Sequence, residues 1–455
     1  MDMKLVQSIY CIGIAGAGMS GLARLLKLRG KQVSGSDLVD SPITQALQAE
    51  GIMVHVLQQA NHVPLDCDLY VYSDAVPETN PERAVLIQRG LGDKTVSYFT
   101  AVGALMKQYT HRIAISGTHG KTTTTAMLTM VLQEAGLDPT AIMGSMLKEL
   151  HSNVRVGANQ DVFIIEACEY KAHMLQLHPT TIIVSNIEED HLDYYRDIDH
   201  IQMTFQQFVN MLPADGLFIR NADDSESREL GFDGTTVSYG LVEPADVMAI
   251  DIKKDGQKQS FKVGDTRYTL SVPGDFNIYN ALAVIAYARH LGIAGKIIQA
   301  ALRKFTGTWR RFEVVGEYRQ ATIISDYAHH PTAVTATIKA AKECYPQRRI
   351  VVVFQPHQHN RTRRLFKKFV TAFDAADLVI IQEIYDVAGR EAKEDQTVSS
   401  HDIVNTIEQT GKLVLYSPDG TKTKKLLAEH IEPNDVVLII GAGDIYRVAE
   451  ELSNV

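Results

Sequence analysis

Short hydrophobic runs alternate along most of the chain with longer segments whose hydrophobic positions repeat at helical spacing. Near the start, SIYCIGI is followed by a glycine-rich turn, the helical pattern LARLLKLRG and the extended segment KQVSGSD. Uninterrupted hydrophobic runs of this length are typical of strands that are buried on both faces of a parallel sheet. The pattern therefore predicts a β-α-β unit at the beginning of the chain, and strand-like runs continue to about residue 108.

The same alternation returns twice. RIAIS, DVFIIEA and TTIIVSN predict strands of a second unit, with a helix from about Lys121 to Ala135. After about residue 313, ATIISDY, RRIVVVFQPH, ADLVIIQEI, KLVLYSP and DVVLIIGAG predict a third. Between about 215 and 275, the short polar pieces TTVSYG, VMAIDIKK, QSFKVG and RYTLSV indicate a small antiparallel insert. We predict an α/β protein with domains at 1–108, 109–313 and 314–455.

Composition agrees with this division and excludes several classes of protein. A chain of 455 residues corresponds to about three domains. The net charge of -9 is dispersed, so neither nucleic acid nor a membrane surface is expected as a partner. Four well-separated cysteines, no secretory signal pattern and no hydrophobic run of about 20 residues lead us to expect a soluble cytoplasmic protein with reduced thiols.

The first candidate site is ISGTHGKTTTTAM (115–127), between a predicted strand and a predicted helix. Glycines let backbone N–H groups turn toward an anion, the helix N-terminus adds partial positive charge, and Lys121 adds a full one. The Thr122 hydroxyl can hold Mg²⁺. The spacing departs from the standard phosphate loop, because Ile115 stands five positions before Gly120, and a plain strand-turn-helix corner is the alternative.

A second glycine-rich turn, GAGMSG, occupies 16–21, and Asp37 follows it sixteen residues after Gly21. This arrangement fits a dinucleotide fingerprint, in which the glycines allow a tight turn and the acidic residue binds a ribose or base. Nicotinamide binding and structural packing are both open for this motif alone. A second nucleotide loop in the same chain favours two different phosphorylated ligands.

Polar clusters follow several of the predicted strands, where open α/β sheets bind ligands. Carboxylates in two of them suit Mg²⁺, while solvated strand ends or helix caps are the alternative; these are Glu166, Glu169 and His173 in EACEYKAH, and Asn186, Asp190, His191 and Asp193 in SNIEEDHLD. Two further clusters end the first two strands of the third domain; these are Asp326, Tyr327, His329 and His330, then His357, His359, Arg361 and Arg363. Arg310 and Arg311 lie at the predicted junction of the second and third domains. Arginine suits phosphates and carboxylates, while a solvated face is the alternative for the arginines and a structural cap for the paired histidines.

Together these motifs resemble the Mur ligases of peptidoglycan synthesis. GTHGKTTT, EACEY, NIEEDHLD, PGDFNIYNA, RRFE, DYAHHP and GAGDI occur in this order over essentially the whole chain. The resemblance implies a Rossmann-like N-terminal domain for a UDP-sugar, a central P-loop ATPase-type α/β domain with a small β insert, and a Rossmann-like C-terminal domain for an amino acid. It implies an ATP- and Mg²⁺-dependent ligase that joins L-alanine to the muramoyl carboxylate of UDP-N-acetylmuramate through an acyl phosphate, as a monomer or weak homodimer. A ligase adding murein tripeptide to the same UDP-sugar is the alternative.

The resemblance also assigns roles to residues. The residues that it assigns to ATP binding are Gly117, Thr118, His119, Gly120, Lys121, Thr122, Thr123, Asn280, Arg311 and Asp326. It assigns Mg²⁺ binding to Thr122, Glu169 and His191, and catalysis to Lys121, Glu169, His191, His329 and Arg361. It assigns UDP-sugar binding to Gly16, Gly18, Met19, Ser20, Gly21 and Asp37, and it places Tyr327, His329 and Arg361 near the muramoyl carboxylate and alanine.

The chain departs from the family pattern at three positions, where Cys168, Phe276 and Gln358 replace aspartate, histidine and a second arginine in many members. Segment 197–212 has no lysine, which agrees with the alanine-adding members. Two other classes of function remain for comparison. In a nicotinamide dehydrogenase, GTHGKTTT would have no function. A non-catalytic nucleotide-binding regulator would bind ATP but release no phosphate with any amino acid.

Overall fold

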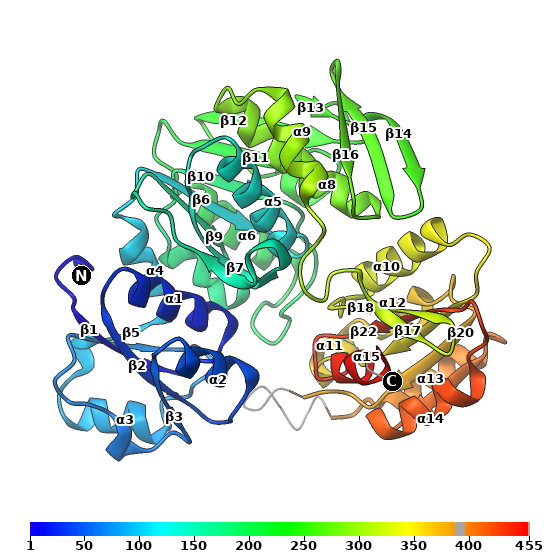
Figure 1. Ribbon diagram of the computed structural model, residues 1–455, viewed down its shortest axis with the longest axis horizontal. Coiled ribbons are helices and arrows are strands. Elements are labelled where there is room, and N and C mark those ends of the chain that lie inside the picture. The colour runs from blue at the N-terminus through cyan, green and yellow to red at the C-terminus, as the bar shows by residue number, and fades with distance from the viewer. Residues whose placement is uncertain (387–395, 454–455) are drawn as a thin grey trace. The chain divides into compact units, whose positions relative to one another are not determined.

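A five-stranded parallel sheet forms the start of the chain in the computed structural model, which describes residues 1–386 and 396–453 (Figure 1). Its strand order is β3-β2-β1-β4-β5, as in an open α/β sheet with a crossover beside β1. The predicted β-α-β unit is thereby confirmed. The elements are β1 (Ser8–Ile12), α1 (Ala17–Leu28), β2 (Gln32–Asp37), α2 (Pro42–Ala49), β3 (Met53–Val56), β4 (Leu69–Tyr72), α3 (Pro81–Gln88), β5 (Thr95–Ser97) and α4 (Tyr98–Met106).

A larger sheet of eight strands follows, with the order β13-β12-β11-β10-β6-β9-β7-β8, where β13 is Val247–Met248. From β12 to β7 the neighbours pair in parallel, and β8 is antiparallel to β7. The elements are β6 (His111–Ser116), α5 (Lys121–Glu134), β7 (Thr140–Leu147), β8 (Ser152–Arg155), β9 (Val162–Glu166), β10 (Thr181–Val184), α6 (Ile198–Val209), β11 (Leu217–Asn221), α7 (Ser225–Arg228) and β12 (Thr235–Gly240).

The assignment of TTVSYG to the antiparallel insert was wrong. These residues form β12, which pairs in parallel with β11 as a continuation of the larger sheet. Thr235 to Ser238 are exposed or half-buried, so their pattern resembles that of a surface strand. The insert itself is confirmed as an antiparallel sheet of β14 (Ile250–Asp255), β15 (Lys258–Val263) and β16 (Thr266–Leu270). The first two residues of VMAIDIKK, however, form β13, which lies beside β12 in the larger sheet.

The C-terminal sheet has six strands in the order β17-β18-β22-β19-β20-β21. All five hydrophobic runs predicted after residue 313 are strands, and they pair in parallel. The structure adds β17, antiparallel to β18. The elements are α8 (Asp275–His290), α9 (Gly295–Lys304), β17 (Glu313–Tyr318), β18 (Ala321–Asp326), α10 (Pro331–Cys344), β19 (Ile350–Phe354), α11 (His359–Arg364), α12 (Phe366–Ala372), β20 (Leu378–Gln382), α13 (Ser400–Glu408), β21 (Val414–Ser417), α14 (Gly420–His430), β22 (Val436–Ile440) and α15 (Tyr446–Ser453).

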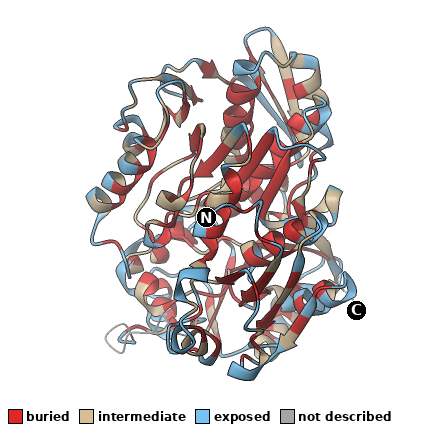
Figure 2. Ribbon diagram, turned by 90° about the vertical axis from the view of Figure 1, so that its left-hand side faces the viewer, coloured by how far each residue is buried: buried red, intermediate tan, exposed pale blue. Residues whose placement is uncertain are grey.

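Burial on both faces of the C-terminal sheet explains the continuous hydrophobic runs. Neighbouring residues of β18, Ile323 and Ile324, belong to two separate core clusters, and Val351 and Val352 of β19 do the same. Complete burial of one such side chain contributes about 1.5–3 kcal/mol. Figure 2 shows many of the strands in the colour of buried residues and many helices with exposed faces.

The molecule consists of two compact units. The first comprises Met1–Ile187, Gln202–Tyr239 and Ala283–Ile298, and the second comprises Glu188–Ile201, Gly240–Leu282 and Gln299–Val455. The three parallel-sheet domains confirm the predicted α/β class, whereas the boundaries at residues 108 and 313 stay predictions.

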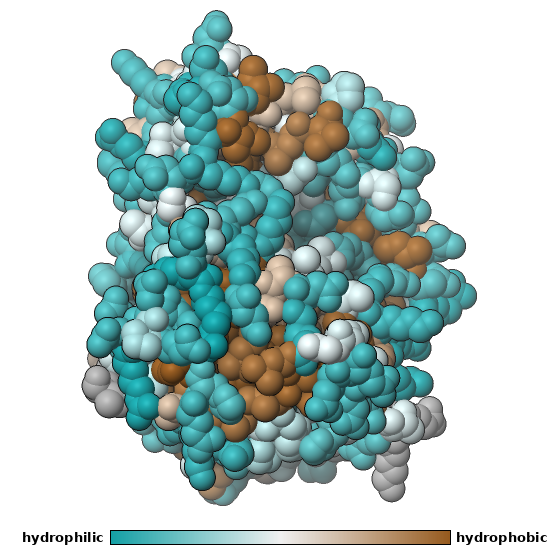
Figure 3. Space-filling view, turned by 90° about the vertical axis from the view of Figure 1, so that its right-hand side faces the viewer, coloured by the Kyte–Doolittle hydropathy of each residue, from teal (hydrophilic) through white to brown (hydrophobic). Residues whose placement is uncertain are grey.

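Hydrophilic residues predominate on the face drawn in Figure 3, with hydrophobic ones in separate groups. Within 1–386 and 396–453, every helix is too short or too polar to cross a membrane.

Candidate active site

The loop between β6 and α5 has a backbone that requires glycine at both ends. Gly117 has φ of 129°, and a Cβ there would lie 2.2 Å from Ser185 Oγ. Gly120 caps α5 with φ of 87°, in the left-handed region. Other residues adopt such angles only at a cost. The glycines are therefore used to turn the chain sharply into the helix.

Asn186, which follows β10, holds this loop. Its carbonyl oxygen accepts the Thr118 N–H at 2.9 Å, and its Oδ1 accepts the His119 N–H at 2.9 Å. Its Nδ2 donates to the His119 carbonyl at 3.2 Å. The N–H groups of the first helical turn, from Lys121 to Thr123, have no acceptor within the helix. A fixed loop that presents helix N–H groups is suited to binding an anion.

Lys121 forms a buried ion pair at the first position of α5. Its Nζ lies 3.0 Å from Glu169 Oε2 and 3.1 Å from Glu169 Oε1, and it donates to the Thr118 carbonyl at 3.2 Å and to the Gly117 carbonyl. Burial lowers the pKa of Lys121, but the Glu169 carboxylate opposes this and raises it above its ordinary value. Lys121 is therefore a permanently charged group at the loop.

Glu166, at the end of β9, also reaches the loop. Its Oε2 accepts the Thr122 hydroxyl at 3.0 Å, and its Oε1 accepts the N–H of Gly144 in β7. A hydroxyl and a carboxylate in contact are oxygen ligands of the kind that Mg²⁺ prefers. The sequence prediction named Thr122 and Glu169 as ligands but did not select Glu166, although its place after a buried strand was a signal.

In the second unit, Asp190 and Arg361 form another buried ion pair. Both Nε and Nη2 of Arg361 donate to Asp190 Oδ1, at 2.9 and 2.8 Å. Burial raises the pKa of Asp190, but Arg361 and the neighbouring histidines more than reverse this and hold it well below its usual range. Arg361 also donates to the His357 carbonyl at 3.1 Å. The sequence prediction selected Arg361 without Asp190, which lies 171 residues away.

His191 lies beside this pair, with φ of 52° and Nε2 4.0 Å from Asp190 Oδ2. A small pocket opens next to it. Its lining consists of Glu189, Asp190, His191, Leu192, Asp193, Gln358, Asn360, Arg361 and Leu365. The predicted metal ligand His191 and the predicted substrate ligand Arg361 thus line one pocket.

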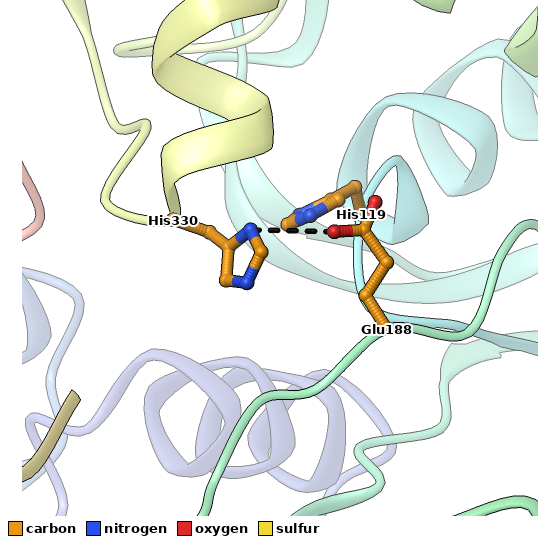
Figure 4. Close-up of side chains that lie close together, drawn as sticks. All are labelled: His119, Glu188 and His330. Carbon is orange, nitrogen blue, oxygen red and sulfur yellow. Dashed lines mark ion pairs between the residues drawn. The ribbon is translucent and has the colours of Figure 1, made fainter. Parts of the chain in front are cut away.

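The two histidines after β18 have different surroundings. His330 caps α10: the Thr332 N–H donates to its Nδ1 at 3.4 Å, and its Nε2 lies 3.1 Å from the Glu189 carbonyl. Figure 4 shows His330 at the start of α10 and its 3.5 Å approach to the Glu188 carboxylate. Burial lowers the pKa of His330. Its ring is therefore neutral near pH 7 and serves as a structural cap.

His329, by contrast, lies near the Asp190–Arg361 pair. Burial and then Arg361 hold the pKa of His329 well below its ordinary value. Its Nδ1 lies 3.0 Å from the Tyr327 carbonyl, and its ring is 5.8 Å from that of His357. A neutral imidazole at this place can accept a proton.

Three other predicted nucleotide residues lie in the second unit. The Asp326 carboxylate accepts the N–H groups of Phe312 at 2.6 Å and Ala328 at 2.7 Å. Burial raises the pKa of Asp326, and Arg311 acts in the opposite direction. The Arg311 guanidinium lies 4.8 Å from the Tyr327 ring centre. Asn280 is buried in α8, where its Nδ2 donates to an asparagine one turn earlier.

The GAGMSG turn is shaped largely by packing. Gly16 caps α1, and a Cβ on Gly18 would lie 2.7 Å from the Tyr98 ring. A Cβ on Gly21 would lie 3.0 Å from a methyl group in β7. Asp37 Oδ2 accepts the Ala15 N–H at 2.9 Å and shapes the turn. Met19 and Ser20 are buried, so their predicted contact with a UDP-sugar stays a prediction.

The structure thus brings the predicted residues together in separate groups within each unit. Lys121, Thr122 and Glu169 meet at the β6–α5 loop, together with Glu166. His191, His329 and Arg361 meet around Asp190.

Two of the three departures from the family pattern lie beside these groups. Cys168 adjoins Glu169 in sequence, whereas Phe276 packs against the core of the C-terminal sheet. Gln358 lines the pocket beside Arg361 with φ of 71°.

Comparisons with known proteins cover the whole chain. Residues 8–110 match the family described as "Mur ligase family, catalytic domain", 115–288 match "Mur ligase middle domain", and 310–443 match "Mur ligase, glutamate ligase domain". The chain is 39% identical to a UDP-N-acetylmuramate–L-alanine ligase of Caldanaerobacter subterraneus, over 99% of this chain and 98% of that protein. It is 40% identical to the protein of the same name from Clostridium novyi, over 98% and 96%.

Two solved structures are also similar. The UDP-N-acetylmuramate-alanine ligase of Thermotoga maritima has a TM-score of 0.82 and 27% identity, covering 98% of both chains. A murein peptide ligase of Psychrobacter arcticus has a TM-score of 0.72 and 25% identity, covering 99% of both. The alanine-adding enzyme is thus the more similar of these two folds.

Proposed function

Because the chain belongs to the Mur ligase family, we propose that it is an ATP-dependent ligase joining L-alanine to the muramoyl carboxylate of UDP-N-acetylmuramate in peptidoglycan precursor synthesis. The observation that carries the proposal is the β6–α5 loop, with its glycine-dependent backbone and the Lys121–Glu169 pair. The full-length relatives support alanine as the amino acid over murein tripeptide. A cytoplasmic location, where ATP and the UDP-sugar are available, belongs to the proposal.

The reaction needs an activated acyl group, because a carboxylate does not react with an amine at neutral pH. Transfer of the γ-phosphoryl group of ATP to the muramoyl carboxylate gives an acyl phosphate, and the alanine amine then displaces phosphate. The first step brings anions together. The N–H groups at the start of α5 and the Lys121 ammonium offset this repulsion and stabilise the charge of the transferred group.

The oxygen ligands at the β6–α5 loop fit a magnesium ion. Thr122 and Glu166 are in contact there, and Glu169 is held by its ion pair with Lys121, so these are the residues of the loop region that would hold it. When bound, Mg²⁺ supplies charge compensation for the phosphates. Thr122, Glu169 and His191 are proposed ligands from the sequence, and Glu166 is added because of its contact with Thr122.

Arg361 and His329 are suited to the second step. The Asp190 carboxylate orients the Arg361 guanidinium through two hydrogen bonds, so that its remaining donors are available to a substrate carboxylate. His329 is neutral near pH 7 because its pKa is lowered, and it can accept the proton that the attacking amine releases.

The test measures ADP and phosphate formation with UDP-N-acetylmuramate and ATP, comparing L-alanine, glycine, L-serine and murein tripeptide. We expect turnover with L-alanine and loss of turnover when EDTA removes divalent metal. Turnover with tripeptide alone would favour the recycling ligase. ATP binding without phosphate release for any amino acid would refute the proposal in favour of a nucleotide-binding regulator.

A further inference from the structure

The linker that precedes β17 has an unusual backbone around Arg311. Its neighbours on both sides, Arg310 and Phe312, have left-handed φ angles of 58° and 47° although neither is glycine. Such angles persist only where surrounding contacts impose them, and they concentrate at functional sites. The contacts that impose them here identify what holds Arg311 in place.

The Arg310 side chain makes these contacts. It is 5% exposed, and its Nη2 donates to the Gly441 carbonyl and, at 3.2 Å, to the Gly443 carbonyl. The guanidinium carbon lies 4.5 Å from the Tyr446 ring centre and 5.5 Å from that of Trp309. Carbonyl oxygens and aromatic faces thus surround its buried charge.

The same loop is connected to Asp326. The Gly441 N–H donates to the Asp326 carbonyl at 3.0 Å, while the Asp326 carboxylate accepts the Phe312 N–H at 2.6 Å. The Tyr327 N–H donates to the Arg310 carbonyl at 2.7 Å. The linker, the end of β18 and the glycine loop after β22 thus form a closed ring of hydrogen bonds, and Arg310 closes it.

The glycine loop is fixed on its other side as well. A Cβ on Gly443 would lie 2.3 Å from Gln355 Oε1 and 2.6 Å from the Tyr385 ring, so the loop is packed too closely to shift toward them. Gln355 Nε2 donates to Asp444 Oδ1 at 2.9 Å. The loop is therefore a rigid anchor for Arg310. This gives a role to the GAGDI motif, none of whose residues was assigned to the nucleotide or to the substrates.

We propose that Arg310 is a positioning residue that clamps the linker onto the glycine loop at Gly441 and Gly443, and thereby places Arg311 and Asp326 for the nucleotide. The inference rests on the proposed function, since that function gives Arg311 and Asp326 their ligand. One nitrogen, Nη2, donates to both carbonyl groups while the guanidinium carbon lies near the Tyr446 and Trp309 rings, and the compact ammonium of lysine lacks this planar shape.

Trp309 provides a direct readout, because the chain has one tryptophan and its ring packs on Tyr446 with centres 5.4 Å apart. In Arg310→Met, we expect tryptophan emission at longer wavelength and stronger quenching by acrylamide. We expect kcat/KM for ATP to fall about 10- to 150-fold, as for loss of a buried charged donor, while KM for the UDP-sugar changes less than about two-fold. Arg310→Lys should recover part of both effects.

The matched control is Arg319→Met. Arg319 also has a left-handed φ, 48°, lies 5.5 Å from a tyrosine ring centre and donates to a carbonyl, but it is exposed. We expect wild-type fluorescence and kinetics. Should Arg310→Met not fold, judged by circular dichroism, Arg310→Lys carries the same comparison.

Unchanged tryptophan emission in a folded Arg310 variant would overturn the proposal, as would equal losses for ATP and the UDP-sugar, which indicate general destabilisation. If the wild type forms no ADP, the proposed function fails instead. In that case, comparing the tryptophan emission of Arg310→Met with that of Arg319→Met still tests whether Arg310 holds the linker.

Discussion

Replacing Asp190 by asparagine removes one charge from a buried ion pair and leaves its shape almost unchanged. Asp190 is 7% exposed and Arg361 is 6% exposed. Both guanidinium hydrogen bonds end on one carboxylate oxygen, Oδ1. An asparagine Oδ1 can still accept them, so the substitution tests the charge rather than the packing.

The structure allows the magnitude to be worked out. At 2.8 Å and an effective dielectric constant of about 20, the attraction is about 6 kcal/mol. Removing both charges from water offsets much of this in the intact pair. In Asp190→Asn, however, the guanidinium of Arg361 stays charged and buried, and the cost of breaking such a pair is about 3–5 kcal/mol. The double variant Asp190→Asn/Arg361→Met should recover at least about 2 kcal/mol of that loss.

Amide hydrogen exchange of 187–193 and 357–365 measures this cost locally, which matters because a chain of three domains need not unfold in one step. The pKa of Asp190 is depressed in the folded state. Its stabilisation is therefore present above the unfolded pKa of about 3.9 and is lost as pH falls through the folded value. The difference between wild type and Asp190→Asn should shrink at acid pH.

The exposed Asp193, in the same segment, is the control: Asp193→Asn should change the opening free energy by less than about 0.5 kcal/mol. The reasoning is refuted if Asp190→Asn behaves like this control. It is also refuted if the double variant is as unstable as the two single variants combined, because the two charges would then act independently.

Three further outcomes are expected. Lys121→Ala should abolish phosphate release while UDP-sugar affinity by calorimetry changes little, and equal loss of both would contradict separate sites. Gly18→Ala should lower the free energy of unfolding by about 1–3 kcal/mol, because the new methyl group meets the Tyr98 ring at 2.7 Å, whereas Gly92→Ala, with open space around it, should not. Because burial holds the pKa of His329 low, the unfolded chain binds more protons than the folded chain below about pH 6.5. The free energy of unfolding should therefore fall as pH drops from about 6.5, by up to about 1.4 kcal/mol per pH unit. His329→Gln should reduce this slope, and an unchanged slope would contradict a lowered pKa for His329.

The strands that sequence analysis found are those buried on both faces. ATIISDY became β18, whose residues are all buried. EVVGEY, which became β17, was missed because its residues are half-buried or exposed and polar residues interrupt it. TTVSYG was found but placed in the wrong sheet, because the residues of a short, partly exposed strand do not encode which strand they pair with.

The backbone of the β6–α5 loop was predictable because its parts are local. Strand, glycines, lysine and helix follow one another within twelve residues of sequence, and the glycine angles depend on the turn itself. Glu166 and Asp190 were quoted but not selected, since their importance comes from their contacts with Thr122 and Arg361. From the sequence, Arg310 and Arg311 were treated as a pair of similar residues, and no separate role for Arg310 was predicted.

Residue order alone was enough to identify the α/β alternation, the glycine-rich turn into α5 and the family, because buried strands, tight turns and helix starts depend on neighbouring residues. Only the folded chain separates Arg310, which is bound to carbonyl groups of a loop 131 residues away, from Arg311 beside it. Burial removes water from such groups, so a distant partner decides whether a charge is bound, neutralised or left available for chemistry.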